Sequence, residues 1–462
     1  MPKILMITYY FPPLGGVGTR RTLKFSQNIV HYGWEPQILT PKKRAFYSED
    51  KDLQKQVESI TKVHETSAFL PVQFLQRMFG HKTNTGIFSP QRTGIFSYLR
   101  NLIFTLFCKP DEFRGWIPFG VHAGKKIIAK NKIDLIYSSG PPNSCHIIAM
   151  HLTKFTHIPW VADLRDLWNM YPHSYNPFSW KWRKLYDMRI ELETLIQANH
   201  IILTSTEMRD SLIKCLPKFP AAKIHTITNG YDPHDFFRLN STKSSDVLTI
   251  VHAGNLFPWR SLEPVLQSLA VLFESAPKYR HKITIKLAGL IPQSELRLIE
   301  RYGMQENIQI LGTLPHAQTM ALVQKSTVLL LLTGTINHAR EMIPGKLFEY
   351  IGAKKPILSI GPIGASSQII ETENRGWHFE KHQCQHIAVK LKNLLQLFEA
   401  GELHFSFNDD SKYQYESLTK DLIKVFNKSI ENNMNSNTFF RNCYSTYENI
   451  RNKNNCDYQS TL

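Results

Sequence analysis

The amino-acid sequence predicts an α/β protein with two domains, each built around a doubly wound parallel sheet. Short apolar runs alternate with longer segments of helical period, a pattern typical of parallel sheets covered by helices. The chain has 462 residues, more than the roughly 250 to 300 at which a single hydrophobic core stops growing. Its residues are 42% hydrophobic and 20% charged, which is enough apolar material for two folded cores.

The predicted strands form two series, one in each half of the chain. The first series comprises residues 3–10, 35–40, 132–139, 159–163 and 200–205, and the second comprises residues 248–254, 282–289, 307–312, 327–332 and 356–360. Between them, residues 226–246 are polar and rich in turn formers, so we place a domain boundary near 235–246. Ligands of doubly wound sheets bind beyond the carboxyl ends of the strands, so two such domains that face each other predict an interdomain cleft.

The C-terminal region differs from both series. From about residue 383 its pattern is mainly helical, and residues 433–462 are rich in Asn, Ser and Tyr. The predicted domains are therefore 1–240 and 241–405, followed by a helix at 406–432 that packs back towards the first domain. The tail at 433–462 is predicted to be poorly ordered.

Residues 68–120 interrupt the alternation of the first domain. Phe, Leu and Ile recur there at helical spacing, and four basic residues lie among them, namely Arg92, Arg100, Lys109 and Arg114. This pattern is compatible with a helix that lies in a membrane interface. It is also compatible with a helical insertion that packs on its own domain, and we favour the packed insertion.

Cysteine usage and hydropathy favour a cytoplasmic protein. The six cysteines are widely spaced and form no CxxC pair, so neither a zinc ribbon nor a dense disulfide framework is indicated. The N-terminal apolar run ends in tyrosines and prolines, not in a small-residue cleavage site, which favours a first strand over a signal peptide. No window reaches the roughly 18 apolar residues that a membrane-spanning helix needs.

The formal net charge of +17 predicts an acidic partner. Nucleic acid, anionic lipid headgroups and phosphorylated small molecules all fit this charge, and charge alone does not choose among them. Because the sequence contains no recognised nucleic-acid-binding module, nucleic acid is not the expected partner.

Residues 341–358, EMIPGKLFEYIGAKKPIL, carry the strongest chemical signal. Pro344 suits the first position of a helix, and a helix that starts there directs free N–H groups and the positive end of its dipole towards the preceding loop. Lys346 in the first turn opposes the usual preference for acids at that place, which makes sense if an anion binds. Glu341 and Glu349 can approach one ligand from two sides, since carboxylates accept paired hydrogen bonds from adjacent hydroxyls. An ordinary capped helix with solvated glutamates explains the same pattern.

These residues carry a resemblance to a known family. The E-x7-E spacing from Glu341 to Glu349, together with PGKLFEYIGAKKPIL, resembles the donor-binding signature of retaining glycosyltransferases of family 4, which have the GT-B fold of two facing Rossmann-like domains. The resemblance implies that Glu349 binds the ribose of a nucleotide-diphosphate sugar and that Glu341 contacts the transferred sugar. It also implies donor contacts for Pro344 and Gly345.

The glycine loop after the first strand agrees with the family. Residues 9–21, YYFPPLGGVGTRR, resemble its first strand and loop, where Gly15 and Gly16 would let the backbone approach the donor phosphates and the acceptor. The loop does not fit G-x-G-x-x-G, and no acid ends the second strand, so a dinucleotide-dependent dehydrogenase is disfavoured.

The second domain supplies cations for the donor diphosphate. Residues 251–260, VHAGNLFPWR, follow its first strand, and Gly254 would approach the donor there. Asn255 stands where many relatives have an arginine, and Arg260 lies near the position of a lysine. Arg260 and Lys346 are thus the expected cationic pair, and fixed cations that neutralise a leaving diphosphate act by electrostatic catalysis. No DxD motif appears at a strand end, so neither a metal nor another cofactor is expected.

Three further stretches agree with the family in order along the chain. Residues 228–232, TNGYD, are similar to its interdomain loop and also fit a simple turn. Residues 287–290, which end in Leu290, and residues 311–332 resemble the base-binding edge with the helix and strand that follow it. The same apolar content would suit any Rossmann-like core.

The acceptor side is predicted from residues 138–168, which resemble the corresponding segment of family members that build surface polysaccharides. Arg165 and Asp166 follow a strand end, and we predict that they serve the acceptor; with Asp163 they also fit a buried ion pair. Many relatives have a histidine at the end of the preceding strand, where it contacts the donor sugar. This chain has serines and prolines there, and His146, a few residues later, is the candidate for that role.

The resemblance implies a retaining, metal-independent glycosyltransferase of the EC 2.4 class. We expect it to move a sugar from a nucleotide-diphosphate donor to a saccharide or polyprenyl-diphosphate-linked acceptor during assembly of capsule, exopolysaccharide or O-antigen. A lipid-linked acceptor would bring the basic, aromatic first domain to the inner face of the plasma membrane, and peripheral association with anionic membrane follows from that. The alternatives are a nucleotide-sugar epimerase of similar fold and a basic nucleic-acid-binding protein.

Overall fold

The chain divides into two compact units, each an α/β fold around one parallel sheet. The computed structural model describes residues 1–42, 51–57, 62–69, 110–166, 168, 181–217, 219–236, 246–257, 259–334 and 339–432. Unit 1 comprises Met1–Thr228 together with Thr419–Leu462, and unit 2 comprises Asn229–Leu418. The predicted α/β fold class with two doubly wound parallel sheets is confirmed.

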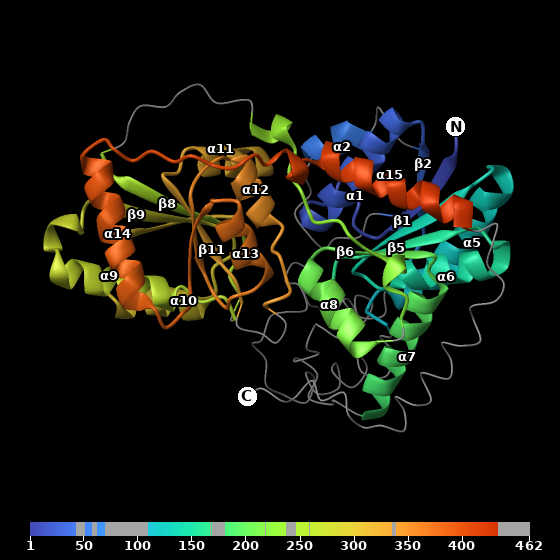
Figure 1. Cartoon of the computed structure of the whole chain (residues 1–462), viewed down its shortest axis with the longest axis horizontal. Coiled ribbons are helices and arrows are strands. Elements are labelled where there is room, and N and C mark those ends of the chain that lie inside the picture. The colour runs from blue at the N-terminus through green and yellow to red at the C-terminus, as the bar shows by residue number, and fades with distance from the viewer. Residues whose placement is uncertain are drawn as a thin grey trace. The chain divides into compact units, whose positions relative to one another are not determined.

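Unit 1 contains a seven-stranded parallel sheet with the strand order β3-β2-β1-β4-β5-β6-β7 (Figure 1). The strands are β1 (Lys3–Thr8), β2 (Glu35–Pro41), β3 (Lys62–Thr66), β4 (Leu135–Gly140), β5 (Trp160–Leu164), β6 (His200–Leu203) and β7 (Ile224–Thr226). The order reverses between β1 and β4, so the loops that follow these two strands flank the topological switch point of the sheet.

Helices cover both faces of this sheet. They are α1 (Val17–Asn28), η1 (Ile29–Tyr32), α2 (Lys51–Val57), η2 (Arg114–Trp116), α5 (Ile117–Lys130), α6 (Ser144–Thr156), α7 (Lys181–Gln197), α8 (Thr206–Cys215), η4 (Ala221–Lys223) and α15 (Tyr415–Asn432). Successive strand residues point to opposite faces, and Ile136 packs in the core with α5 and α6. The next residue, Tyr137, contacts Phe426 of α15 on the other face.

Unit 2 contains a six-stranded parallel sheet with the order β10-β9-β8-β11-β12-β13. Its strands are β8 (Leu248–Ala253), β9 (Ile283–Ala288), β10 (Ile308–Gly312), β11 (Val328–Leu332), β12 (Ile357–Ile360) and β13 (Gly376–Phe379). Here the switch point lies between β8 and β11. The segment from 251 to 260 therefore begins in a central strand and continues into the loop where such folds bind ligands.

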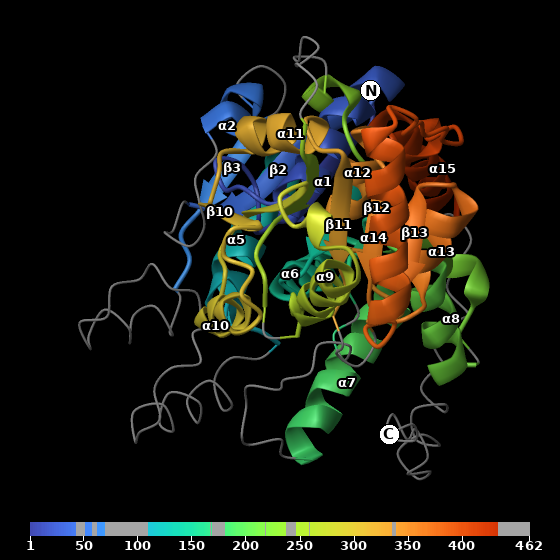
Figure 2. The same ribbon diagram turned by 90° about the vertical axis from the view of Figure 1, so that its left-hand side faces the viewer.

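Two separate apolar clusters pack against the sheet of unit 2. The helical segments of this unit are η5 (Pro233–Phe236), α9 (Glu263–Ser275), η6 (Pro277–Tyr279), α10 (Gln293–Arg301), α11 (His316–Gln324), α12 (Lys346–Gly352), α13 (Ala365–Thr372), α14 (Cys384–Glu399) and η7 (Ser411–Tyr413). One cluster joins alternate strand residues to α9, α10 and α14, and the other joins the intervening residues to α11, α12 and α13. Figure 2 shows α14 beside α9, and the two helices pack against each other.

The last described helix, α15, begins among residues of unit 2 and continues into unit 1. Within unit 1 the Phe426 ring packs edge-on against Trp34, with 5.3 Å between ring centroids. At the start of this helix the Tyr231 N–H donates to the Tyr413 carbonyl at 3.0 Å, and the Tyr415 N–H donates to the Tyr231 carbonyl at 3.1 Å. These bonds fix Tyr231 against residues 413–415. The predicted tail at 433–462 and most of the segment at 68–120 lie outside the described residues.

None of the helices that the structure describes combines the length and apolar character needed to cross a bilayer.

Candidate active site

The loop after β8 brings backbone and cationic side chains together at the switch point of unit 2. Gly254 has φ +122°, a left-handed conformation that favours glycine. Its N–H donates to the Ala288 carbonyl at 2.7 Å, which ties the loop to the end of β9. A Cβ on Gly254 would lie 3.2 Å from Nζ of Lys346. The glycine thus leaves room for the lysine to lie against the loop.

The Lys346 ammonium lies beside a buried histidine. Its Nζ is 3.1 Å from Nε2 of His252, and Nδ1 of His252 is 2.9 Å from the Leu330 carbonyl oxygen. Because a carbonyl only accepts, Nδ1 carries the ring proton and Nε2 accepts a hydrogen bond from Lys346. Burial lowers the pKa of His252 well below its usual value, and the charge of Lys346 lowers it further. His252 is therefore neutral.

Arg260 adds a second cation beside Lys346. Burial lowers the pKa of Lys346 to about 7, and the nearby charge of Arg260 acts in the same direction, against a smaller opposite effect of Glu349. Among the residues that the structure describes, no carboxylate lies within 4.0 Å of Nζ of Lys346. Two cations held this close in a poorly solvated place are stabilised by an anion between them. The structure brings the predicted pair together.

Helix α12 starts at Lys346, slightly later than the predicted start at 344–345. Gly345 already has a helical conformation as the N-cap, and the Leu347 N–H donates to the Pro344 carbonyl at 2.9 Å. The first turn is therefore tight. Because α12 has only seven residues, its dipole is small, and the side-chain cations supply most of the positive potential.

Glu349 and Glu341 lie on different segments of unit 2, and both are half-buried. Glu349 belongs to α12, and its neighbour Tyr350 accepts a hydrogen bond at 2.8 Å from the Ala253 N–H. This contact fixes α12 to the end of β8. Glu341 lies in the loop before α12. That loop is held by the Ala365 N–H, which donates to the carbonyl of residue 340 at 2.7 Å.

Asn255 and Leu290 connect two loops at the same edge of the sheet. Oδ1 of Asn255 accepts a hydrogen bond from the Leu290 N–H at 2.9 Å, and the Leu256 N–H donates to the Leu290 carbonyl at 3.0 Å. Asn255 is exposed, and the Leu290 side chain is 63% exposed. Asn255 thus orders the loop, whereas an arginine at this position would supply charge. Leu290 presents an apolar surface to solvent.

Sequence reasoning missed three residues beside Lys346 and Arg260, namely His252, Tyr350 and Trp259. Trp259 stacks on Phe257 with 5.0 Å between ring centroids and 4° between ring planes, and the Arg260 guanidinium lies 5.8 Å from the Phe257 ring. The signal that could have found His252 is a single histidine inside an otherwise apolar strand, since such a residue needs polar partners when buried.

In unit 1, Gly15 and Gly16 lie between β1 and the first turn of α1. Gly16 is the N-cap of α1 with φ 106°, a conformation that again favours glycine. A small pocket opens at this edge of the sheet. It is lined by Tyr9, Phe11, Pro12, Pro13, Leu14, Thr40, Pro41, Lys42 and Glu65, from the ends of β1, β2 and β3.

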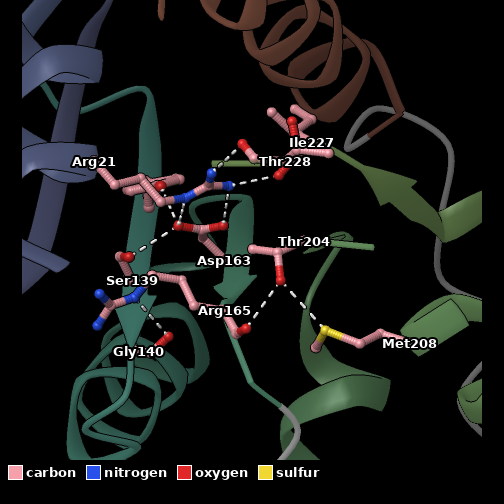
Figure 3. Close-up of polar contacts among 10 residues, drawn as sticks. Arg21, Ser139, Gly140, Asp163, Arg165, Thr204, Met208, Ile227 and Thr228 are labelled. Atoms are coloured by element: carbon pink, nitrogen blue, oxygen red, sulfur yellow. Dashed lines mark hydrogen bonds and ion pairs between the residues drawn. The ribbon is translucent and has the colours of Figure 1, made fainter. Parts of the chain in front are cut away.

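Arg165 lies at the switch point of unit 1 and is held by backbone carbonyls (Figure 3). Its Nε donates to the Gly140 carbonyl at 3.1 Å, and Nη2 donates to the Pro141 carbonyl. The guanidinium passes over Gly18, where any Cβ would collide with it. Asp166 follows in the chain and is half-buried. Both predicted acceptor-side residues thus lie just beyond β5.

Asp163 forms a buried ion pair with Arg21 (Figure 3). The guanidinium Nε and Nη2 atoms lie 2.9 and 2.8 Å from the two carboxylate oxygens, and both side chains have no exposed surface. Burial disfavours the Asp163 charge, but Arg21 and the hydroxyl donors Tyr137 and Ser139 outweigh it and hold the Asp163 pKa below its usual value. Of the two interpretations of this segment, the ion pair describes Asp163, and its partner is Arg21 instead of Arg165.

His146 lies in the core of unit 1 and has no exposed surface. Its Nδ1 is 2.8 Å from Oγ of Ser138, which also accepts a hydrogen bond from Nε1 of Trp160. Burial lowers the pKa of His146 to about 3, so the ring is neutral. The contacts of this buried ring favour a packing role.

Two family models match successive parts of the chain. Residues 80–235 match the family model described as Glycosyltransferase Family 4, and residues 234–402 match the model described as Glycosyl transferases group 1. A comparison with curated protein sequences gives no significant match.

Several solved structures share the fold. Sucrose-phosphate synthase from Thermosynechococcus elongatus superposes with a TM-score of 0.61 at 13% identity, covering 93% of this chain and 99% of that one. A variant of S. aureus TarM in complex with fondaparinux, alpha-GlcNAc-glycerol and UDP has a TM-score of 0.60 at 13% identity, with coverages of 92% and 100%. WaaG, a glycosyltransferase involved in lipopolysaccharide biosynthesis, has a TM-score of 0.54 at 13% identity, with coverages of 94% and 100%.

Proposed function

The chain belongs to the group 1 and family 4 glycosyltransferases of GT-B fold, and from this premise we propose that it builds a surface polysaccharide by adding a sugar to a saccharide or lipid-linked saccharide acceptor. Its family makes it a retaining enzyme of the EC 2.4 class that uses a nucleotide-sugar donor, and family members are generally metal-independent. The capsule, exopolysaccharide or O-antigen pathway is the part that we propose.

The observation that carries the proposal is the pair of cations in unit 2. Lys346 and Arg260 lie close enough to depress the lysine pKa, and Gly254 leaves space beside Nζ. A leaving nucleotide diphosphate gains negative charge as the glycosidic bond breaks, and fixed cations stabilise that charge without reorganisation. The pair of cations therefore suits the diphosphate of a donor better than an uncharged sugar.

The remaining roles are proposed for the two glutamates. Glu349 accepts hydrogen bonds from the ribose hydroxyls, and Glu341 orients the transferred sugar. The bond between the anomeric carbon and the diphosphate oxygen breaks while the acceptor oxygen bonds the same face of that carbon. The departing phosphate oxygen takes the acceptor proton. His146 has no role in this scheme.

The acceptor is proposed to bind unit 1, at the edge that carries Gly15, Gly16, Arg165 and Asp166. Arg165 is anchored through two backbone carbonyls, so its guanidinium is held in a fixed position beside α1. A saccharide offers hydroxyl groups to such polar groups, and a lipid-linked saccharide also offers phosphates.

Peripheral association with an anionic membrane is proposed for the surface of α5 and α6. These helices pack against each other through Gly120 and Gly124 and contain no acidic residue. Phe119 and Phe155 are 42% and 64% exposed among their lysines. Basic side chains with exposed aromatic rings fit an anionic headgroup layer.

Titration calorimetry with UDP, GDP and ADP tests the donor site. We expect one nucleotide to bind the wild type and Lys346→Met to weaken it by about tenfold to a hundredfold, since a hydrogen bond to a charged group contributes about 1.5 to 3 kcal/mol. Lys325→Met removes an exposed lysine of the same unit and serves as the matched control. Equal binding by wild type and Lys346→Met contradicts the proposal, and so does a Glu349→Ala enzyme with full turnover.

Two further measurements separate the alternatives. Salt-sensitive binding of RNA in place of any nucleotide favours the nucleic-acid binder. Release of an epimerised or free sugar without an acceptor favours the epimerase.

A further inference from the structure

We propose that His252 is a positioning residue for the donor diphosphate: its neutral imidazole holds the Lys346 ammonium in place without cancelling the charge. The inference rests on the proposed function, because it takes the anion at Lys346 to be the donor's diphosphate.

The imidazole is fixed from its other side. Nδ1 donates to the Leu330 carbonyl at 2.9 Å, and the ring has no exposed surface. The tautomer is therefore set by the strand β11, and the Nε2 lone pair has one direction, towards Nζ of Lys346 at 3.1 Å. A lysine side chain is otherwise mobile about four carbon–carbon bonds.

A neutral acceptor differs from the usual partner of a buried lysine. A carboxylate at the same distance would also orient the ammonium, but the opposite charges would cancel much of the field that a diphosphate experiences. The imidazole takes up one of the three N–H donors of Lys346 and leaves two for phosphate oxygens. The Lys346 ammonium thus keeps both a fixed orientation and its charge.

The other groups around His252 and Lys346 are consistent with a lysine that is oriented by the imidazole and keeps its charge. Arg260 lies on the loop after β8 and repels both Lys346 and a protonated His252. Glu349 on α12 is the acid that acts on Lys346, and its effect is smaller than that of Arg260. Tyr350, also on α12, directs its hydroxyl to Ala253 instead of the lysine.

Two substitutions of matched polarity test the role. His252→Gln places an amide near Nε2 and keeps a neutral acceptor for Lys346. His252→Asn places its amide near Nδ1, so it keeps a donor for Leu330 and removes the acceptor for Lys346. We expect the donor kcat/KM to fall about tenfold or more in His252→Asn, with kcat falling as well because Lys346 also stabilises the leaving charge, and to stay within about threefold of wild type in His252→Gln.

A second readout needs no nucleotide. The pKa of Lys346, followed by NMR of its Cε or by labelling against pH, is expected to fall in His252→Asn and to stay near the wild-type value in His252→Gln, since an acceptor stabilises the ammonium. Thermal melting establishes that both variants are folded. If His252→Asn does not fold, His252→Leu replaces it, because leucine also lacks an acceptor for Lys346. If His252→Gln does not fold, His252→Glu replaces it. The glutamate would cancel the charge of Lys346, so this variant is expected to lose donor binding.

The outcomes separate the two proposals. Equal impairment of folded His252→Gln and His252→Asn, or an unchanged Lys346 pKa in both, overturns the role of His252. Failure of every nucleotide diphosphate to bind the wild type overturns the proposed function, while the Lys346 pKa still decides whether His252 holds the lysine.

Discussion

Asp163 is ionised inside the core of unit 1 because Arg21 and two hydroxyl groups bind its carboxylate. Replacing it by asparagine leaves a buried guanidinium without its counter-charge, so we expect Asp163→Asn to lower the free energy of unfolding by about 3 to 5 kcal/mol. Urea unfolding measures this. Asp421→Asn breaks an exposed pair with Lys424 and is expected to cost less than about 1 kcal/mol.

The Asp163 contribution depends on pH in a defined direction. Its pKa in the folded protein is below the ordinary value of 3.8, so the stabilisation is complete above that value and is lost as the pH falls through the folded-state pKa. The difference between wild type and Asp163→Asn should shrink only in that acidic range. A difference that already shrinks near neutral pH would contradict the ion-pair description.

Lys346 predicts that donor binding takes up a proton. Its pKa is about 7 without ligand, and a diphosphate beside it raises that value. Below pH 7 the lysine is already charged, whereas above pH 7 binding must protonate it. Donor affinity should therefore fall by up to about tenfold per pH unit above pH 7. Calorimetry in two buffers of different ionisation enthalpy measures the uptake, which Lys346→Met should abolish.

At the residue scale, the charged residues of the site could be predicted from the sequence, but the buried residues that hold them in place could not. The spacing of Glu341 and Glu349 and the basic Lys346 and Arg260 are visible as motifs, and the structure brings Lys346 and Arg260 together. The role of His252 depends on which ring nitrogen meets Leu330, and that contact joins residues far apart in the chain. Likewise, Arg21 as the partner of Asp163 depends on the fold of α1.

At the element scale, the central strands and the edge strand β10 could be predicted, whereas the edge strands β3, β7 and β13 could not. Central strands such as β1 and β11 are buried on both faces and are therefore continuous apolar runs. The edge strand β3 reads KVHET, β7 has only three residues, and β13 reads GWHF. Half-exposed or very short strands carry little hydrophobic pattern, so the sequence series omitted them.

Helix α15 provides a prediction at this scale. Phe426 is fully buried and contacts the rings of Trp34 and Tyr137. Phe426→Ala should lower the free energy of unfolding by about 3 to 5 kcal/mol through the cavity it leaves. Chemical denaturation followed by tryptophan fluorescence measures the change. The exposed neighbour provides the control, because Asn427→Ala should change stability by about 0.5 kcal/mol or less.

At the scale of the whole molecule, part of the positive charge that gives the net value of +17 lies on the surface of α5 and α6. The α5–α6 surface carries exposed Lys126 and Lys154 beside Phe155, and each lysine near an anionic bilayer contributes about 1 kcal/mol. We expect Lys126→Glu with Lys154→Glu to weaken binding to vesicles of anionic lipid by at least about tenfold.

Vesicle sedimentation at low and high salt measures this. Lys325→Glu with Lys381→Glu makes the same change in net charge on unit 2 and should have little effect. Equal loss with both pairs would indicate that total charge, and not this surface, governs the interaction.

The chain leaves unit 1 at Thr228 and returns to it at Thr419. A ribosome therefore finishes all of unit 2 before it makes the segment that covers Trp34 and Tyr137. Domains tend to fold as units during synthesis, so the aromatic surface of the first-made unit remains open to chaperones, or to other nascent chains, until α15 emerges. Helix α15, which is translated after all of unit 2, thus determines when the core of unit 1 is complete.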